Sequence, residues 1–352
     1  MGKTFGRIIS LLYFFIPVAI GAKILGYETL EFAASALAIV PLARLMGHAT
    51  EALAARAGSG LGAFLKSSLG NAAELIIAFM ALAKGNKEIV KASITGSIIG
   101  NLLFVLGLSM YMGGLRRKEQ RFTATVAESG AAMLFVAVVA LAIPSIVNQF
   151  SHEVSEGKVF RMSVWTSVIL LLTYVAGIFF SFRTHKHLYN DAEEQETAVK
   201  VPIRRALIEL VASAALISLL AEFLVSSVEH ASAKLGFSAT FVGVIVVAVV
   251  GNAAEHFAAV TFAMKDKMNL SIGISIESSK QVALFVAPVL VLSSFFFPVH
   301  LDLAFTAFEA AAIALSVIIV ALVSLDGKSN WLEGFMLLAV YAIMGVAFYF
   351  TG

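Results

Sequence analysis

The pentapeptide Gly70-Asn71-Ala72-Ala73-Glu74 occurs a second time, unchanged, as Gly251-Asn252-Ala253-Ala254-Glu255. The correspondence continues at the same spacing beyond both copies, pairing Lys84 with Lys265, Ser97 with Ser278, and Leu103-Phe104-Val105 with Leu284-Phe285-Val286. A shared register over about 36 residues indicates an internal repeat, and a repeat constrains the fold more than a single motif does. The sequence therefore predicts two related halves, each organised around one glutamate.

The composition is that of an integral membrane protein, with the lipid bilayer as its surroundings. Of the 352 residues, 59% are hydrophobic and 14% are charged, and the mean hydropathy is +0.91. An average soluble domain is about a quarter charged. The absence of cysteine excludes disulfides, thiol catalysis and cysteine-ligated metals. The sequence contains no cluster of basic residues that would indicate binding to nucleic acid.

Apolar segments recur along the whole chain. A transmembrane helix needs about 20 consecutive apolar residues. Polar or glycine-containing breaks divide the chain into eleven candidate spans, at about residues 8–25, 30–55, 61–83, 89–112, 123–147, 162–182, 203–228, 239–264, 270–296, 303–324 and 331–350. We therefore expect an all-α polytopic membrane protein with 11 transmembrane helices.

The orientation follows from the cationic residues. The loops that would face inward with a cytoplasmic N-terminus carry most of the Lys and Arg, including Arg116, Arg117 and Lys118, which predicts that orientation. The first apolar segment is interpreted as a retained helix, since Gly21-Ala22-Lys23 is a poor signal-peptidase site. An odd number of spans then places the C-terminus outside, in a multi-pass protein of the cell membrane.

The two motif-bearing spans are the third and the eighth, so an odd displacement makes them cross the membrane in opposite directions. This predicts two inverted five-helix repeats, an arrangement found in secondary transporters, whose sites lie near the midplane. The domains would be an N-terminal helix (1–29), a first repeat (30–183), a cytoplasmic acidic linker (184–201) and a second repeat (202–352).

The predicted linker is the most polar segment and contains His185, His187, Asp191, Glu193, Glu194 and Glu196. Two interpretations stay open. It is either a solvated connector of mixed charge or an acidic collector of cations beside an entry vestibule. The two histidines alone are weak evidence for a bound metal.

The repeated glutamates are costly where they stand, because an ionised carboxylate within a span costs roughly 3 kcal/mol or more on insertion scales. Glycine followed by asparagine weakens a helix, which predicts a break in each motif that exposes backbone carbonyls. We expect one midplane site with only oxygen ligands and two negative charges, from Gly70, Asn71, Glu74, Gly251, Asn252 and Glu255. Such a ligand set suits a hard divalent cation such as Ca²⁺.

Several further side chains are candidates for a supporting role. Hydroxyls of Ser97 and Ser278 and amides of Asn101 and Gln281 lie on the spans that follow the motifs, although serine in such a helix commonly bonds its own backbone. Glu51 and Glu222 form another pair of carboxylates, which either line vestibules or bond neighbouring helices.

A buried carboxylate can hold either a proton or a cation, because burial favours its neutral form and a divalent cation favours its ionised form. This mutual exclusion is the physical basis of an antiporter. The alternative, that Glu74 and Glu255 merely pair with lysines or backbone donors, is disfavoured because the duplication places both away from the cations of their own spans.

The motifs resemble the two signature repeats of the calcium/proton exchangers, the CAX branch of the calcium/cation antiporter superfamily. The similar stretches are the nine residues from Gly70, Gly96-Ser97 with Gly100-Asn101-Leu102-Leu103, the six residues Gly251 to His256, and Gln281 to Pro288. Sodium/calcium exchangers usually carry Pro before the acidic residue and a Gly-Thr-Ser pattern, both absent here.

The resemblance covers the second to the eleventh span. It implies an eleven-helix fold with inverted repeats, export of Ca²⁺ against protons, and Glu74 and Glu255 as the exchanging carboxylates. His256 also matches the family, and imidazole, which titrates near pH 6.5, suits proton sensing. One position departs from the family, because Glu277 stands where Gly is expected before Ser278, and it could pair with Lys280 three residues on.

The leading interpretation is thus a Ca²⁺/H⁺ antiporter that needs no cofactor beyond its transported ions. Exchange of Na⁺, K⁺ or Mn²⁺ is an alternative, since oxygen ligands do not choose one ion uniquely. An intramembrane hydrolase could also use paired carboxylates. Symmetric duplication favours a transporter over an enzyme, because the residues of an active site have distinct roles. The sequence does not set the oligomeric state.

Overall fold

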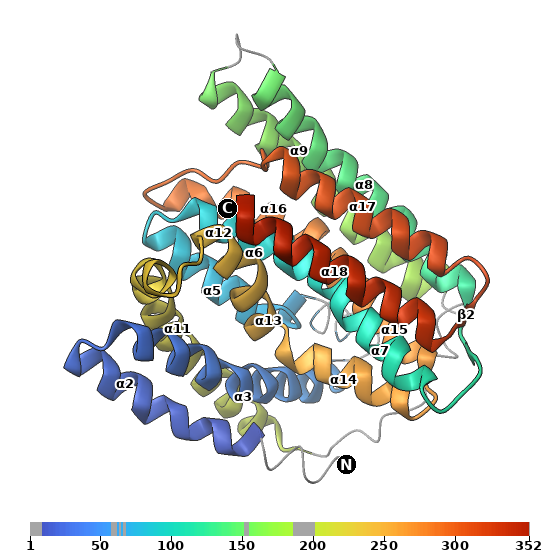
Figure 1. The fold of residues 1–352 in the computed structure, drawn as a ribbon, viewed down its shortest axis with the longest axis horizontal. Coiled ribbons are helices and arrows are strands. Elements are labelled where there is room, and N and C mark those ends of the chain that lie inside the picture. Colours follow the sequence, from blue (N-terminus) through green and yellow to red (C-terminus); the bar gives the residue numbers. More distant parts are fainter. Residues whose placement is uncertain are drawn as a thin grey trace. The chain divides into compact units, whose positions relative to one another are not determined.

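The computed structural model describes residues 9–57, 62, 65, 68–150, 155–185 and 201–351. These residues are almost entirely helical (Figure 1). They form two compact units, each assembled from both halves of the chain. Unit 1 comprises Met1–Ser93, Thr197–Ala254 and Phe348–Gly352, and unit 2 comprises Ile94–Glu196 and Glu255–Ala347.

Unit 1 is built around two long helices, α3 (Glu28–Ala54) and α11 (Ile203–Leu235), which pack along each other. In Figure 1 they lie beside α2 (Phe15–Leu25), which follows the short 3₁₀ turn η1 (Leu12–Phe14). Both α2 and α11 end at a glycine in the left-handed conformation, Gly26 at φ 73° and Gly236 at φ 71°, which a side chain would disfavour.

The other helices of unit 1 contain the first motif and the beginning of the second, whose Glu255 belongs to unit 2. They are α5 (Ala72–Ala83), the first turns of α6 (Lys87–Ile99), α12 (Ala239–Phe241), the π-helical segment η5 (Val242–Val247) and α13 (Ala248–Gly251). α5 packs against both α11 and α13. A Cβ on Gly243 would lie 2.6 Å from the Cβ of Ala92, so a glycine is needed where these backbones approach.

Unit 2 begins with the rest of α6, the π-helical η2 (Gly100–Val105) and α7 (Leu106–Gly114). α8 (Ala124–Phe150), α9 (Glu156–Phe179) with η3 (Phe180–Thr184), and α17 (Ala307–Val323) follow, with α8 packed against both α9 and α17 (Figure 1). A capping box between Thr306 and Glu309 fixes the start of α17.

The second half supplies the remaining elements of unit 2. They are α14 (Ala253–Met264) from Glu255 onward, α15 (Met268–Gln281), the π-helical η6 (Val282–Val286), α16 (Ala287–Ser293), η7 (Ser294–Phe296) and α18 (Trp331–Thr351) as far as Ala347. α7 and α18 meet at glycines, since a Cβ on Gly107 would lie 2.9 Å from Leu337 Cβ.

A short antiparallel ribbon was not expected from the sequence. β1 (Gln120–Arg121) pairs with β2 (Lys328–Ser329) and joins the α7–α8 and α17–α18 connections. Lys328 Nζ and Arg121 Nη2 both contact the carboxylate of Glu119, at 3.2 and 2.9 Å. Hydrogen bonding from Arg121 first, and from Lys328 second, lowers the pKa of Glu119 below its usual range.

The all-helical membrane architecture is confirmed. Among the described residues, seven helices are long and apolar enough to cross a membrane, and the broken pair Ala239–Gly251 and Ala253–Met264 would make an eighth. Three shorter apolar helices, Ile9–Leu25, Ala72–Ala83 and Ala307–Val323, coincide with further predicted spans. The count of eleven and the inverted five-helix repeats stay predictions, as does the division into domains.

Two parts of the predicted organisation lie outside the described residues. The first is residues 61, 63, 64, 66 and 67 of the predicted span 61–83. The second is residues 186–200 of the predicted linker, with His187, Asp191, Glu193, Glu194 and Glu196. His185 is described, and its ring stacks on Phe180 at 4.0 Å between centroids.

Candidate functional site

The first motif interrupts a helix as expected. Gly70 and Asn71 form a turn, and α5 begins directly after them at Ala72. Glu74 therefore lies in the first turn of α5, with 7% of the residue exposed. The first backbone N–H groups of a helix have no intrahelical partner and carry its positive dipole end, so this position stabilises a buried carboxylate.

The second motif repeats this construction. α13 ends at Gly251 and α14 begins at Ala253, which places Glu255 in the first turn of the new helix. The buried side chain of Asn252 donates from Nδ2 to the carbonyl of Ala248 at 2.9 Å. The backbone N–H of Asn252 donates to the same carbonyl at 3.2 Å, so the asparagine holds the end of α13 through two bonds to one acceptor. The break predicted in each motif is present in both.

Unit 1 brings the carboxylate of the first motif against the glycine of the second. A Cβ on Gly251 would lie 3.0 Å from Glu74 Cγ and 3.5 Å from its Cδ. α5 and α13 are packed against each other at this point. Gly251 thus has a role that the sequence did not reveal, because it leaves the space into which the Glu74 side chain extends.

In unit 2, the carboxylate of the second motif has a hydroxyl partner. Ser278 on α15 donates from Oγ to Oε2 of Glu255. This bond to Glu255 takes the place of the bond to its own backbone that is common for serine in such helices. Whether Ser278 also binds a cation stays a prediction.

His256 follows Glu255 and packs edge-on against Phe104, with 6.2 Å between ring centroids. Within the described residues, its Nε2 is buried and has no hydrogen-bond partner. Phe104 also contacts Tyr341 of α18, with 5.2 Å between ring centroids. The Tyr341 hydroxyl is buried and has no hydrogen-bond partner among the described residues. Unpaired buried polar groups are uncommon and call for an explanation such as a water, an ion or a functional role.

The remaining predicted amides lie at π-helical segments. Asn101 lies inside η2, and Gln281 is the last residue of α15, directly before η6. Both are buried, as is Ser97 on α6. Irregular turns of this kind are frequent at functional sites. The sequence did not predict them, although η2 and η6 contain the repeated Leu-Phe-Val stretch of each half.

The other carboxylate pair has a different setting. Glu222 on α11 binds Lys84 Nζ at 3.2 Å, and both side chains are nearly half exposed. It therefore links α11 to the end of α5, in agreement with the interpretation that it bonds a neighbouring helix. Glu51 lies exposed in the last turn of α3.

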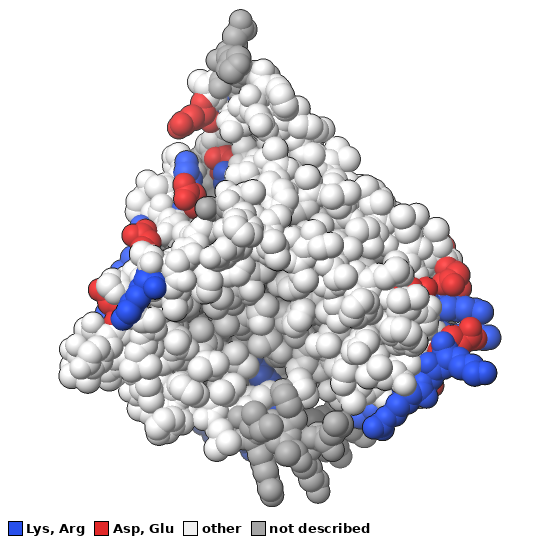
Figure 2. Space-filling view, viewed as in Figure 1, with Lys and Arg blue, Asp and Glu red and all other residues white. Residues whose placement is uncertain are grey.

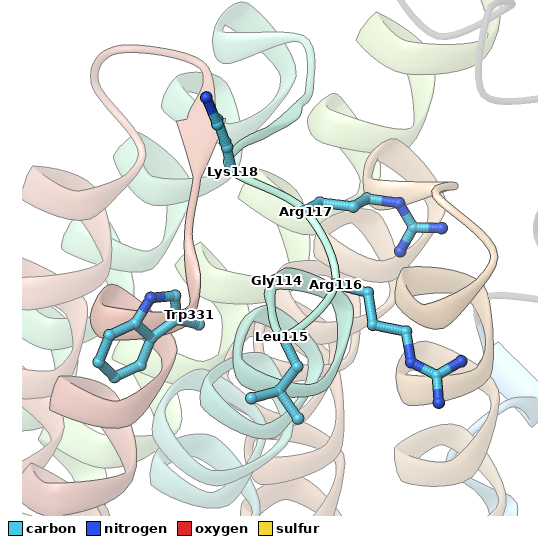
Figure 3. A pocket seen from close by; sticks show the side chains of 6 residues that line it. All are labelled: Gly114, Leu115, Arg116, Arg117, Lys118 and Trp331. Carbon is cyan, nitrogen blue, oxygen red and sulfur yellow. The ribbon is translucent and has the colours of Figure 1, made fainter.

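A surface hollow in unit 2 is unsuited to a divalent cation. It is lined by Gly114, Leu115, Arg116, Arg117, Lys118 and Trp331, and Figure 3 shows its three cationic side chains. Figure 2 shows Lys and Arg gathered at this end of unit 2, beside β2. In the described part of the chain, no three His, Asp or Glu side chains form a metal site. A bound Ca²⁺ would thus also need amide and carbonyl oxygens.

The chain is similar in sequence to known membrane exchangers. The sodium/calcium exchanger protein family matches residues 27–183 and 205–350. The Ca²⁺/H⁺ antiporter of Aphanothece halophytica is 42% identical, with 96% of this chain and 95% of that protein covered. The Ca²⁺/H⁺ antiporter ChaA of Bacillus subtilis is 40% identical, with 96% and 98% covered.

Solved structures agree with this assignment. Native YfkE superimposes with a TM-score of 0.84 at 37% identity, over 97% of this chain and 99% of that one. The H⁺/Ca²⁺ exchanger CAX shares the fold, with a TM-score of 0.73 at 14% identity over 98% and 92%. The relatives are transporters, which excludes the hydrolase alternative. The chain belongs to the sodium/calcium exchanger family and, within it, to the calcium/proton exchangers that its two motifs resemble.

Proposed function

We propose that this protein is a Ca²⁺/H⁺ antiporter of the cell membrane that exports Ca²⁺ from the cytoplasm in exchange for protons. The observation that carries the proposal is the twofold placement of a glutamate in the first turn of a helix that restarts after a Gly-Asn break. Relatives at 42% and 40% identity that are named Ca²⁺/H⁺ antiporters support the choice of ions.

The proposed site is shared by Glu74 and Glu255 near the midplane of the membrane. Asn71 and Asn252 would add amide oxygens, and the chain at Gly70 and Gly251 would add carbonyls, as the sequence symmetry and the two helix breaks suggest. Two carboxylates neutralise one divalent cation, or alternatively bind protons. His256, the residue after Glu255, would add a second group that binds a proton beside this carboxylate.

Coupling follows from the cost of moving an empty site. With neither Ca²⁺ nor protons bound, two negative charges would have to pass through an occluded, dry state, which desolvation makes unfavourable. Either ligand removes that cost, and a ligand shifts only those states that it binds differently. We propose alternating access by movement of α2, α3, α9 and α11 past the other helices of the repeats.

The test is transport by the purified protein in liposomes. An imposed pH gradient should drive ⁴⁵Ca²⁺ movement, whereas a Na⁺ gradient at equal pH on both sides should not. Competition by unlabelled Na⁺, K⁺ and Mn²⁺ distinguishes the alternative cations. Ca²⁺ movement driven by Na⁺ and indifferent to pH would contradict the proposal.

A further inference from the structure

An ion pair lies within the membrane-spanning part of α15. Lys280 Nζ contacts Glu277 Oε2 at 2.6 Å, with 6% of the lysine side chain exposed and 43% of the glutamate side chain. A charged residue inside a span is expensive and usually functional. At the equivalent positions of the first half stand Gly96 and Ile99, which are uncharged. The pair is therefore an addition to the second half alone.

The fold makes room for this lysine. Gly130 of α8 faces α15, and a Cβ there would clash with Ile276 Cγ2 and lie 3.8 Å from Lys280 Cδ. The aliphatic stem of Lys280 thus packs beside Gly130, and its ammonium is enclosed. Among the described residues, Glu277 is the acidic side chain that pairs with this ammonium.

The pair lies at the depth of the second motif's carboxylate. Ser278, the residue after Glu277, donates its hydroxyl to Glu255. Successive Cα atoms are about 3.8 Å apart, so the Glu277 carboxylate is within about 10 Å of this hydrogen bond. The Glu277 side chain is 43% exposed and the Lys280 side chain 6%, so the carboxylate is the accessible member of the pair.

We propose that Lys280 sets the Ca²⁺ affinity of the site by acting as a tethered counter-cation. Its ammonium pairs with the Glu277 carboxylate, which would otherwise be a third carboxylate beside those of Glu74 and Glu255. The ion pair prevents Glu277 from binding the transported ion together with Glu255. The second half then presents one effective negative charge, as the first half does. Ca²⁺ can leave the site, because it is not held by an extra carboxylate. The inference rests on the proposed function and concerns the affinity of that same site.

The test begins with Lys280→Met, which keeps an unbranched side chain of similar length and removes the charge. Equilibrium binding of ⁴⁵Ca²⁺ to the purified protein should tighten by about tenfold. One unmasked unit charge at about 10 Å, at an effective dielectric constant of about 20, accounts for an effect of at least that size on a divalent cation. Exchange at saturating Ca²⁺ should slow, because release becomes harder.

Two further variants make the test specific. Glu277→Gln combined with Lys280→Met should return the affinity to the wild-type value, because no third carboxylate is left. Glu277→Gly combined with Lys280→Ile copies the first half and should also bind Ca²⁺ as the wild type does. If Lys280→Met alone does not fold, this double variant still tests the inference. Lys84→Met, which releases the exposed Glu222, is the matched control and should leave the affinity unchanged.

An unchanged affinity in Lys280→Met, or tight binding that persists when Glu277 is also neutral, overturns the inference. A fall in affinity of more than about tenfold in the Gly-Ile variant overturns it too. Failure of the proposed function is recognised separately, by Glu255→Gln in the same assay. If that variant keeps full Ca²⁺ binding, the site is elsewhere, whereas loss of binding there with no effect of Lys280→Met rejects the counter-cation alone.

Discussion

The two motifs have the same five residues but different surroundings. In unit 1, Glu74 is almost fully buried and its side chain extends against Gly251. In unit 2, Glu255 is only partly buried and accepts a hydroxyl hydrogen bond from Ser278. The repeated sequence determines where the helix breaks and where the carboxylate stands. The neighbours of each carboxylate determine what it contacts.

The residues after the glutamates extend the difference. Leu75 follows Glu74, whereas His256 follows Glu255, and its buried Nε2 has no partner among the residues that the structure describes. The ion pair of Glu277 and Lys280 also belongs to the second half only. We therefore expect the two halves to respond differently to protons. The second half carries the additional titratable groups.

The largest effect is expected from neutralising either glutamate. Glu74→Gln and Glu255→Gln should each abolish exchange, because one carboxylate cannot neutralise a divalent cation. Both variants should fold, since a buried carboxylate that loses its charge no longer bears a desolvation cost. Proton-driven ⁴⁵Ca²⁺ uptake by inverted membrane vesicles measures the result. Robust uptake by either variant would show that the two halves do not both contribute to the site.

The pH dependence of binding compares the halves directly. Protons compete with Ca²⁺ for carboxylates, so the binding constant should fall as the pH falls, in proportion to the number of protons displaced. We expect a steeper dependence in the wild type than in either single Gln variant, wherever binding remains measurable. A binding constant that is flat between about pH 6 and 8.5 would mean that Ca²⁺ and protons use separate groups.

Much of the fold was predictable because it follows from local composition. Apolar length gives the spans, and the Gly-Asn pairs give the helix breaks, since both are properties of short segments. The contact of Glu74 with Gly251 was not predictable, because it joins residues from different halves. The ribbon of β1 and β2 was missed for the same reason, since each strand has only two residues and no pattern of its own.

The π-helical segments show a second limit of sequence analysis. In the π-helical segments η2 and η6, backbone hydrogen bonds join residues five apart instead of four. This change within a single turn leaves no mark on the apolar periodicity of the sequence. Their position inside the repeated Leu-Phe-Val stretches is visible only once the structure is known. The pairing of Ser278 with Glu255 instead of its own backbone likewise depended on how α14 and α15 pack.

A smaller effect is expected when Gly251 receives a side chain. The Cβ of Gly251→Ala would lie 3.0 Å from Glu74 Cγ and push the carboxylate aside. We expect the transport rate to fall by about 10- to 100-fold, since displacements of about 1 Å have effects of that size on positioned groups. Gly47→Ala on α3, where a Cβ meets nothing within 4 Å, is the matched control. Equal rates for both variants would mean that Gly251 does not position Glu74.

The smallest effect separates the two serines. Ser278→Ala removes the hydroxyl that donates to Glu255, and a buried hydrogen bond to a charged group contributes about 1.5–3 kcal/mol net. Because Glu255 is partly exposed, water can replace much of that bond, and we expect Ca²⁺ affinity to fall by about tenfold or less. Ser97→Ala is the matched change in the first half, measured by the same binding assay on folded, purified protein.

If the halves are equivalent in function as well as in sequence, the two losses should agree within about threefold, since measured contributions of single hydrogen bonds scatter by that much. A loss confined to Ser278→Ala would show that only the second carboxylate depends on a serine, and that the repeat preserves the helix break more strictly than it preserves the partners of the charge.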